Sequence, residues 1–250
     1  MSSSQEAPEW YRDWFGEEYL ALYPHRDEEE ARDGVDLLLR ACGQPSGLVL
    51  DLASGAGRHL LEFQRRGVKA VGLDLSKTLL KQARAGSPAL LVAEGDMRYL
   101  PFADDAFQMV ANFFTSFGYF AEPEEDEKVL AEIRRVLRLD GCFMLDFLNA
   151  ERVRTGLVAK DERLLNGRLV VQERRLEEDG KIVVKKIQIH GHESDDSVST
   201  FHERVRLYSP DELQVILHRA GLEPESTFGD YSGTPASPDC PRYILTGRAV

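Results

Sequence analysis

The stretch that decides the fold spans residues 48–58, which read Leu48-Val49-Leu50-Asp51-Leu52-Ala53-Ser54-Gly55-Ala56-Gly57-Arg58. An apolar run ends in an acid, passes through small residues and opens into a helical pattern, which predicts a buried strand, a tight loop and a helix N-terminus. Gly55 and Gly57 lack a Cβ atom, so the backbone can turn sharply there and a ligand can lie against it. Asp51 ends the strand, at the edge where open α/β sheets bind their ligands.

The composition is typical of a globular chain that acts on a small molecule. The 250 residues, 42% of them hydrophobic, are enough for a sizeable core. No apolar run approaches the roughly 18 residues of a membrane span, and the polar start of the chain lacks the apolar segment of a secretory signal. The formal net charge of -12 disfavours nucleic acid as a partner. We therefore expect a cytoplasmic protein with a small-molecule partner and with neither a nucleic-acid nor a membrane partner.

The cysteines predict neither a metal site nor a disulfide framework. Cys42, Cys142 and Cys240 lie far apart in the chain, without the spacing of metal ligands. Because their number is odd and they form no framework, they indicate a reducing compartment.

Strands and helices alternate along most of the chain. After the opening strand, further strands are expected at 68–74, 89–93, 108–114 and 141–147, with helices at 58–67, 77–85 and 123–137 between them. Ser209 and Pro210 begin another helix, and two strands at 222–228 and 242–248 follow it. Alternation in short units predicts parallel pairing with right-handed crossovers. The expected fold is α/β, with a Rossmann-like, mostly parallel seven-stranded sheet covered by helices on both faces.

The pattern changes after residue 150. Three strands are expected at 164–176, 181–190 and 198–208, and Glu178-Asp179-Gly180 is a hairpin signal between the first two. No helical repeat separates these strands, so they must pair antiparallel. We expect residues 1–150 and 209–250 to form the main domain, with 151–208 as a small inserted antiparallel sheet.

The first 43 residues are expected to form a helical lid. Residues 8–25 are dense in aromatic side chains at helical spacing, and 27–41 read as an amphipathic helix. The simpler interpretation of the aromatic segment is a short helix packed on the body of the protein. The alternative is a lid that closes over a planar or cationic ligand, and the two interpretations are compatible.

Three acids end successive strands and suggest an adenosine ligand. Asp74 follows Asp51 by one strand–helix–strand unit, and a carboxylate at that place suits the two hydroxyls of a ribose. Asp96, after the third strand, can accept a hydrogen bond from an exocyclic amino group. Asp51 favours a cation over a diphosphate in the same crevice. The predicted ligand combines adenosine with an ammonium or sulfonium group.

These residues resemble the motifs of the class I S-adenosylmethionine-dependent methyltransferases. Residues 51–57 resemble motif I, 73–76 the second motif, 95–97 the third, 107–110 with 112–118 the fourth, and 137–141 the turn before strand five. Ala53 stands where the family usually has Gly. The resemblance covers about the first 150 residues and, more loosely, the last 40. The inserted sheet is similar to that of small-molecule N- and O-methyltransferases, including glycine- and aminosugar-type enzymes.

The resemblance implies S-adenosylmethionine as the cofactor, S-adenosylhomocysteine as its product, and a monomer or homodimer. It places the methionine end on one group of residues, the ribose on Asp74, and the adenine against Leu75, Asp96 and Met97. Phe113 and Thr115 are expected beneath the methionine and facing the acceptor. The residues at the methionine end are Asp51, Ala53, Gly55 and Gly57.

Methyl transfer needs alignment more than a reactive side chain, because the cofactor carries the activated group. A general base is required only if the acceptor arrives protonated. The candidates are Tyr119, His192 and Tyr231, with His190 and His202 as further histidines, although a lone His on a strand is more often structural. Arg58 either reaches the methionine carboxylate or lies on the helix surface.

Two other functions fit part of the sequence. A nicotinamide-dependent oxidoreductase needs a third glycine where Leu60 stands. A non-catalytic S-adenosylmethionine-binding protein is compatible with the absence of a clear base. A nucleic acid methyltransferase is disfavoured, because residues 112–115 lack an Asn-Pro-Pro-Tyr-like turn and the net charge is negative.

Overall fold

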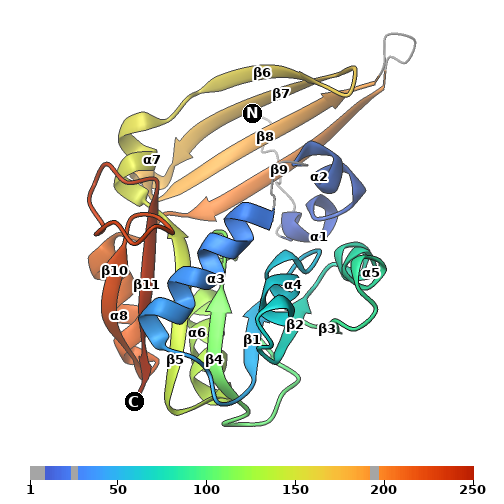
Figure 1. The fold of residues 1–250 in the computed structure, drawn as a ribbon. Helices are drawn as coiled ribbons and strands as arrows, with labels where there is room; N and C mark the ends of the chain where they lie inside the picture. The colour runs from blue at the N-terminus through green and yellow to red at the C-terminus, as the bar shows by residue number, and fades with distance from the viewer. Residues whose placement is uncertain (1–8, 24–27, 192–196) are drawn as a thin grey trace.

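The computed structural model describes residues 9–23, 28–191 and 197–250, and its main feature is a seven-stranded sheet (Figure 1). The strand order is β10-β11-β5-β4-β1-β2-β3, with β11 antiparallel to both neighbours and the other pairs parallel. The expected Rossmann-like fold class is therefore confirmed. The strands are β1 (Val49–Leu52), β2 (Ala70–Asp74), β3 (Leu91–Glu94), β4 (Phe107–Asn112), β5 (Leu137–Leu148), β10 (Leu222–Phe228) and β11 (Arg242–Ala249).

Helices cover both faces of this sheet. On one face lie α3 (Glu28–Cys42), α4 (Arg58–Arg65) and α5 (Lys77–Gly86), and on the other α6 (Pro123–Val136) and α8 (Pro210–Arg219) (Figure 1). The expected caps are present: the Ser76 hydroxyl accepts from Leu79 N at 3.2 Å, and Ser209 and Glu212 form a capping box at the start of α8. β1 is buried along its whole length, which accounts for its unbroken apolar character.

A second, antiparallel sheet lies over the carboxyl ends of the main strands (Figure 1). It contains β6 (Lys160–Leu165), β7 (Arg168–Glu177), β8 (Ile182–His190) and β9 (Val198–Arg206), in that order. The prediction of one strand over 164–176 was wrong, because Asn166 and Gly167 take φ angles of 51° and 77° and form a two-residue hairpin turn. The expected turn at 178–180 is present as a short 3₁₀ segment, η1 (Glu178–Gly180).

A helix that the sequence analysis did not predict connects the two sheets. This helix, α7 (Ala150–Gly156), begins after Asn149, whose side chain accepts from Arg152 N at 3.4 Å. Asn149 also donates to backbone oxygens of the 229–241 loop, including Ser237 O at 2.8 Å. The N-cap preference of Asn was visible in the sequence, but seven residues carry too little periodicity to reveal a helix.

The N-terminal aromatic segment forms α1 (Trp10–Trp14) and α2 (Glu17–Leu22), which pack beneath the second sheet. Trp14 is 1% exposed, donates its Nε1–H to Glu203 at 2.7 Å, and stacks at a tilt on Phe201 with ring centroids 4.9 Å apart. Packing on the body of the protein is therefore observed. Closure as a lid stays a prediction.

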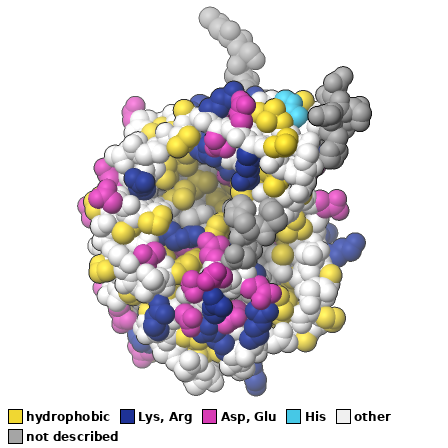
Figure 2. All heavy atoms as spheres, turned by 45° about the horizontal axis from the view of Figure 1, so that its top comes forward, with side chains coloured by type: hydrophobic (Ala, Val, Ile, Leu, Met, Phe, Trp, Pro, Cys, Tyr) yellow, Lys and Arg dark blue, Asp and Glu magenta, His cyan; other side chains and the backbone are white. Residues whose placement is uncertain are grey.

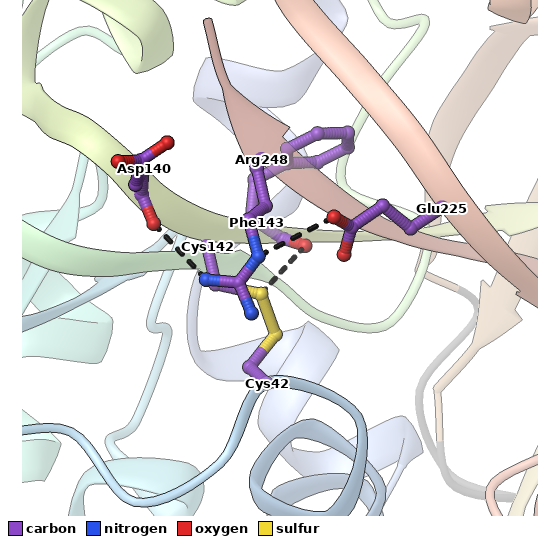
Figure 3. The surroundings of a disulfide bond; sticks show 6 residues. All are labelled: Cys42, Asp140, Cys142, Phe143, Glu225 and Arg248. Atoms are coloured by element: carbon purple, nitrogen blue, oxygen red, sulfur yellow. Dashed lines mark hydrogen bonds and ion pairs between the residues drawn. A yellow bond between two sulfur atoms is a disulfide. The ribbon is translucent and has the colours of Figure 1, made fainter.

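The structure contains a disulfide, contrary to the expectation of unpaired cysteines. Cys42 at the end of α3 is bonded to Cys142 in β5, with Cα atoms 5.9 Å apart, and Cys240 is the free thiol (Figure 3). The two partners are 100 residues apart, so their proximity depends on how α3 packs across β5 and was not visible in the sequence. Among the described residues, no helix is long and apolar enough to cross a membrane, and no cluster of side chains has metal-binding geometry.

Candidate active site

Two adjoining chambers open at the carboxyl ends of the main strands. The β2 chamber, about 600 Å³, lies beside β2 and β3, and the β4 chamber, about 760 Å³, lies between β4 and the second sheet. Figure 2 shows a hollow with hydrophobic walls and charged side chains around its rim. Residues that line both chambers form their junction: Phe15, Tyr19, Ala53, Gly55, Leu79, Ser116 and Tyr119.

The loop after β1 forms one wall of this junction. Ala53, Gly55 and Gly57 all have positive φ angles, of 61°, 54° and 81°. Gly57 lines neither chamber; a Cβ there would lie 3.0 Å from Leu90 and 3.1 Å from Ala83, so this glycine lets α4 pack against the α5 region. The sequence placed all three at the cofactor, and the structure puts only the first two at the chamber wall.

Among the described buried residues with polar atoms that lack partners, Ser54 and His59 line the β4 chamber, whereas Asp51, which the sequence placed at the cofactor, and Asn112 line neither chamber. Both carboxyl oxygens of Asp51 and one polar atom each of Ser54, His59 and Asn112 have no hydrogen-bond partner among the described residues. Burial raises the pKa of Asp51 well above its usual value, and the charge of Arg58 only partly opposes this. Unsatisfied buried groups are costly, so this place fits a polar ligand, and Asp51 in particular fits a cation.

His59 is held neutral in this cluster. It is 4% exposed and stacks on Phe113 with ring centroids 4.0 Å apart. Burial lowers its pKa well below the usual value, and the nearby charges of Arg58 and Arg242 act in the same direction. His59 and Phe113 both line the β4 chamber. His59 was not among the site residues predicted from the sequence. Its only sequence signal was its position directly after Arg58, at the predicted start of the helix.

The predicted adenosine residues line the β2 chamber together. Asp74 accepts from Gly55 N at 2.7 Å and Ser76 N at 2.8 Å, and burial raises its pKa despite these bonds. Its carboxylate retains lone pairs for further donors. Asp96 is bound by the Arg98 guanidinium at 2.6 Å, and hydrogen bonds from Arg98 outweigh burial and lower its pKa. Leu75 and Met97 complete this wall.

The turn after β4 holds two residues in the left-handed region. Phe114 and Thr115 have φ angles of 60° and 57°, which is strained for residues with side chains. Asp146 of β5 accounts for this geometry, because its Oδ2 accepts from Phe114 N at 2.7 Å and its backbone oxygen from Thr115 N at 3.0 Å. Thr115 lines the β4 chamber, as Phe113 does.

The guanidinium groups of two arginines lie over the Phe114 ring. Arg58 and Arg242 lie 4.7 Å and 4.6 Å from its centroid, and both bind Glu30 of α3, at 2.6 Å and 2.8 Å. Arg242 also binds Asp146 at 2.8 Å. Arg58 is therefore half-buried and ion-paired at the chamber wall.

The three candidate bases occupy different places. Tyr119 lines both chambers and packs against Trp10 with ring centroids 4.9 Å apart. Tyr231 lines neither chamber; it is buried and donates to Asp146 Oδ2 at 2.5 Å. His192 lies outside the described residues, and His190 and His202 line neither chamber.

Charged residues of the insert line the β4 chamber. Lys185 and Glu203 are cross-strand partners paired at 3.4 Å, and Asp161 binds Arg174. Arg152 lines the chamber from α7. The strand register places the side chains of the strand residues on one face of the second sheet. Only the tertiary structure shows that this face lines the β4 chamber.

Comparison with known proteins agrees with this geometry. Residues 49–141 match a family model described as a methyltransferase domain. The chain is 28% identical to the dTDP-3-amino-3,4,6-trideoxy-alpha-D-glucopyranose N,N-dimethyltransferase of Streptomyces venezuelae, over 86% of this chain and 92% of that protein. It is 28% identical to the cypemycin N-terminal methyltransferase of a Streptomyces species, over 75% and 77%.

A solved structure shares the whole architecture. The S-adenosylmethionine-dependent methyltransferase from Clostridium acetobutylicum ATCC 824 superposes with a TM-score of 0.79 at 16% identity, covering 92% of this chain and 97% of that one, which shows a common fold. Motif residues, strand order and the methyltransferase domain matched over residues 49–141 therefore agree with an S-adenosylmethionine-dependent methyltransferase.

Proposed function

We propose that this enzyme methylates the nitrogen of a small-molecule amine, with S-adenosylmethionine lying across the two chambers and the acceptor under the second sheet. One observation carries the proposal: the chamber lined by Asp74 and Asp96 shares Ala53 and Gly55 with the β4 chamber, so the two adjoin at the loop after β1. One curated relative described above is named an N,N-dimethyltransferase of an amino sugar and the other an N-terminal methyltransferase, which favours nitrogen over oxygen.

Within this proposal, each end of the cofactor lies beside side chains that can bind it. Asp74 accepts from the ribose hydroxyls, and Asp96 with Met97 contacts the adenine. The methionine ammonium lies toward the buried Asp51, which has no other partner among the described residues. Phe113 and Thr115 face the reacting methyl group.

The protein's contribution to the reaction is alignment and exclusion of water. The bound cofactor supplies a methyl group on a positively charged sulfur. The amine nitrogen, with its lone pair free, forms the new N–C bond as the C–S bond breaks, the electron pair goes to sulfur, and the nitrogen then releases a proton. Aromatic side chains at the junction, including Phe15 and Tyr119, keep this region dry. Tyr119, which lines both chambers, is the candidate that could relay this proton, passing its own hydroxyl proton to solvent as it accepts one.

The cofactor site is tested by replacing Asp74. Asp74→Ala removes a charge-assisted acceptor, so we expect the affinity for S-adenosylhomocysteine to fall by about 10- to 100-fold in titration calorimetry. Asp33→Ala, on the outer side of α3 and half-exposed, is the matched control and should bind as the wild type does. Equal affinity in both variants would remove Asp74 from the ribose role, and binding of NADH without S-adenosylhomocysteine would favour the oxidoreductase.

The reaction itself is tested by transfer of a labelled methyl group. We expect labelled product with amines and none with alcohols of the same carbon skeleton. A complete absence of product with all acceptor classes, alongside normal cofactor binding, would favour a non-catalytic binding protein.

We also infer the division into a cofactor domain (1–150 and 209–250, with 1–43 as lid) and an inserted acceptor subdomain (151–208). We further propose a cytoplasmic location, with the enzyme as a monomer or homodimer; the Cys42–Cys142 disulfide is the observation that speaks against a reducing compartment. Cell fractionation and light scattering of the purified chain check these points.

A further inference from the structure

We propose that Arg152 is an anion-binding residue of the β4 chamber, and that the acceptor is an amine that carries a carboxylate or phosphate group. The inference rests on the proposed function, because it takes the β4 chamber as the acceptor site. Arg152 lines this chamber from α7, the short helix that follows β5.

The lining of the β4 chamber has an excess of positive charge in an acidic protein. Four cationic side chains line it against two carboxylates, whereas the whole chain has a formal net charge of -12. A cofactor with a sulfonium group adds to this excess. Such a chamber favours an anionic ligand. The cationic residues are Arg58, Arg152, Arg174 and Lys185, and the acidic ones are Asp161 and Glu203.

Arg152 is an exposed residue, and it differs from the other cations because no described carboxylate pairs with it. Its guanidinium forms no hydrogen bond or ion pair with any residue of 9–23, 28–191 or 197–250. Guanidinium groups bind carboxylates and phosphates through two parallel hydrogen bonds, so Arg152 can take such a group without breaking an existing pair. The other cations pair as Arg174 with Asp161, Lys185 with Glu203, and Arg58 with Glu30.

The strand order puts Arg152 on the acceptor side of the reacting center. The adenosine residues follow β2 and β3, the junction follows β1, and α7 follows β5, which is two strands from β1 on the opposite side. Neighbouring strands lie about 4.8 Å apart, so the end of β5 is on the order of 10 Å from the end of β1. That span suits a small molecule with a nucleophile at one end and an anionic group at the other.

Apolar side chains line the chamber together with these charges. Leu148 and Val153 contribute from β5 and α7, and Val183 and Val205 from paired positions of the second sheet. An acceptor with a nonpolar or ring-shaped body would lie along these residues, with its amine at the junction and its anionic group at Arg152.

The anion site is tested by titration without turnover. Inorganic pyrophosphate and acetate are titrated separately into the protein, alone and with S-adenosylhomocysteine, and whichever binds identifies phosphate or carboxylate as the preferred group. We expect Arg152→Gln to weaken that binding at least tenfold and Arg152→Lys to weaken it less. The control Arg32→Gln changes a half-exposed α3 arginine outside both linings and should bind as the wild type does. Failure of the wild type to bind either anion, or equal binding by Arg152→Gln, overturns the proposal.

Turnover with paired acceptors separates this inference from the proposed function. Glucosamine 6-phosphate is compared with glucosamine, and glycine with ethanolamine. We expect the wild type to favour the anionic member of the pair it methylates at least tenfold in kcat/KM, and Arg152→Gln to lose the preference through a higher KM. A preference that survives in Arg152→Gln overturns the anion site. If the wild type methylates no amine at all, the proposed function fails, and the pyrophosphate and acetate titrations still decide the role of Arg152.

Discussion

A buried carboxyl group with a raised pKa links folding to pH, and Asp126 is such a group. It lies in the first turn of α6, is 0% exposed, and accepts from the Tyr208 hydroxyl at 2.8 Å. Burial raises its pKa to about 7, and the Tyr208 hydrogen bond and the charge of Arg206 oppose this only in part. In the unfolded chain the pKa of Asp is about 3.9. Between pH about 4 and about 7, the Asp126 carboxyl is therefore mostly protonated in the folded protein and mostly ionised in the unfolded chain.

This pKa difference predicts that stability falls as pH rises from about 4 to about 7, because the folded state must give up a proton that it holds more tightly. Asp126→Asn keeps an acceptor for Tyr208 and cannot ionise. We expect the excess of its free energy of unfolding over that of the wild type to grow by on the order of 2 kcal/mol between pH 5 and pH 8. Urea titrations at both pH values measure this, with Asp33→Asn as an exposed control. An identical pH dependence in Asp126→Asn and the wild type would contradict the assignment.

At the scale of elements, Asp146 connects four segments around the β4 turn. It binds Phe114 N, Arg242 and the Tyr231 hydroxyl, and Arg242 continues to Glu30 of α3. The turn, β11, the 229–241 loop and α3 therefore share one buried network. A left-handed turn with side chains persists only when its surroundings fix it, and this network does so.

Tyr231→Phe tests the network without touching either chamber. It removes one hydrogen bond to a buried carboxylate, so we expect the free energy of unfolding to fall by about 1–2 kcal/mol. The affinity for S-adenosylhomocysteine should stay within about threefold, while kcat falls by about 3- to 10-fold because the Phe114–Thr115 turn is held less firmly. Tyr99→Phe, at a 66% exposed tyrosine, is the control. Weakened cofactor binding with unchanged kcat would instead place Tyr231 in the cofactor site.

For the whole molecule, the disulfide joins α3 to the centre of the main sheet across 100 residues of chain. Closing so long a loop restricts the unfolded state, so we expect replacement of Cys42 and Cys142 by Ala to lower the free energy of unfolding by about 2–4 kcal/mol. Neither cysteine lines a chamber, and the affinity for S-adenosylhomocysteine should be retained. Thermal unfolding and calorimetry of the double variant, with Cys240→Ser as control, measure both quantities. Loss of cofactor binding in the double variant would show that the α3 position controls the site.

The sequence by itself determined the main sheet and the cofactor edge. An apolar run that ends in Asp51 and small residues dictates a buried strand and a tight loop, because both depend on neighbouring residues and on local sterics. The same holds for Ser76 and Ser209, whose capping bonds close within three residues. Asn166-Gly167 is an equally local signal, and the hairpin turn it forms was absent from the predicted strand over 164–176.

Only the tertiary structure decided which side chains meet. Residues that are distant along the chain meet in the cysteine pair, in the Asp146 network and among the charged residues of the insert that line the β4 chamber. Their spacing in the sequence does not reveal these contacts. Their positions follow from α3 packing on β5 and from the second sheet lying over the strand ends. Local sequence thus encodes the loops proposed to bind the cofactor, whereas the proposed acceptor site, including Arg152, depends on long-range packing.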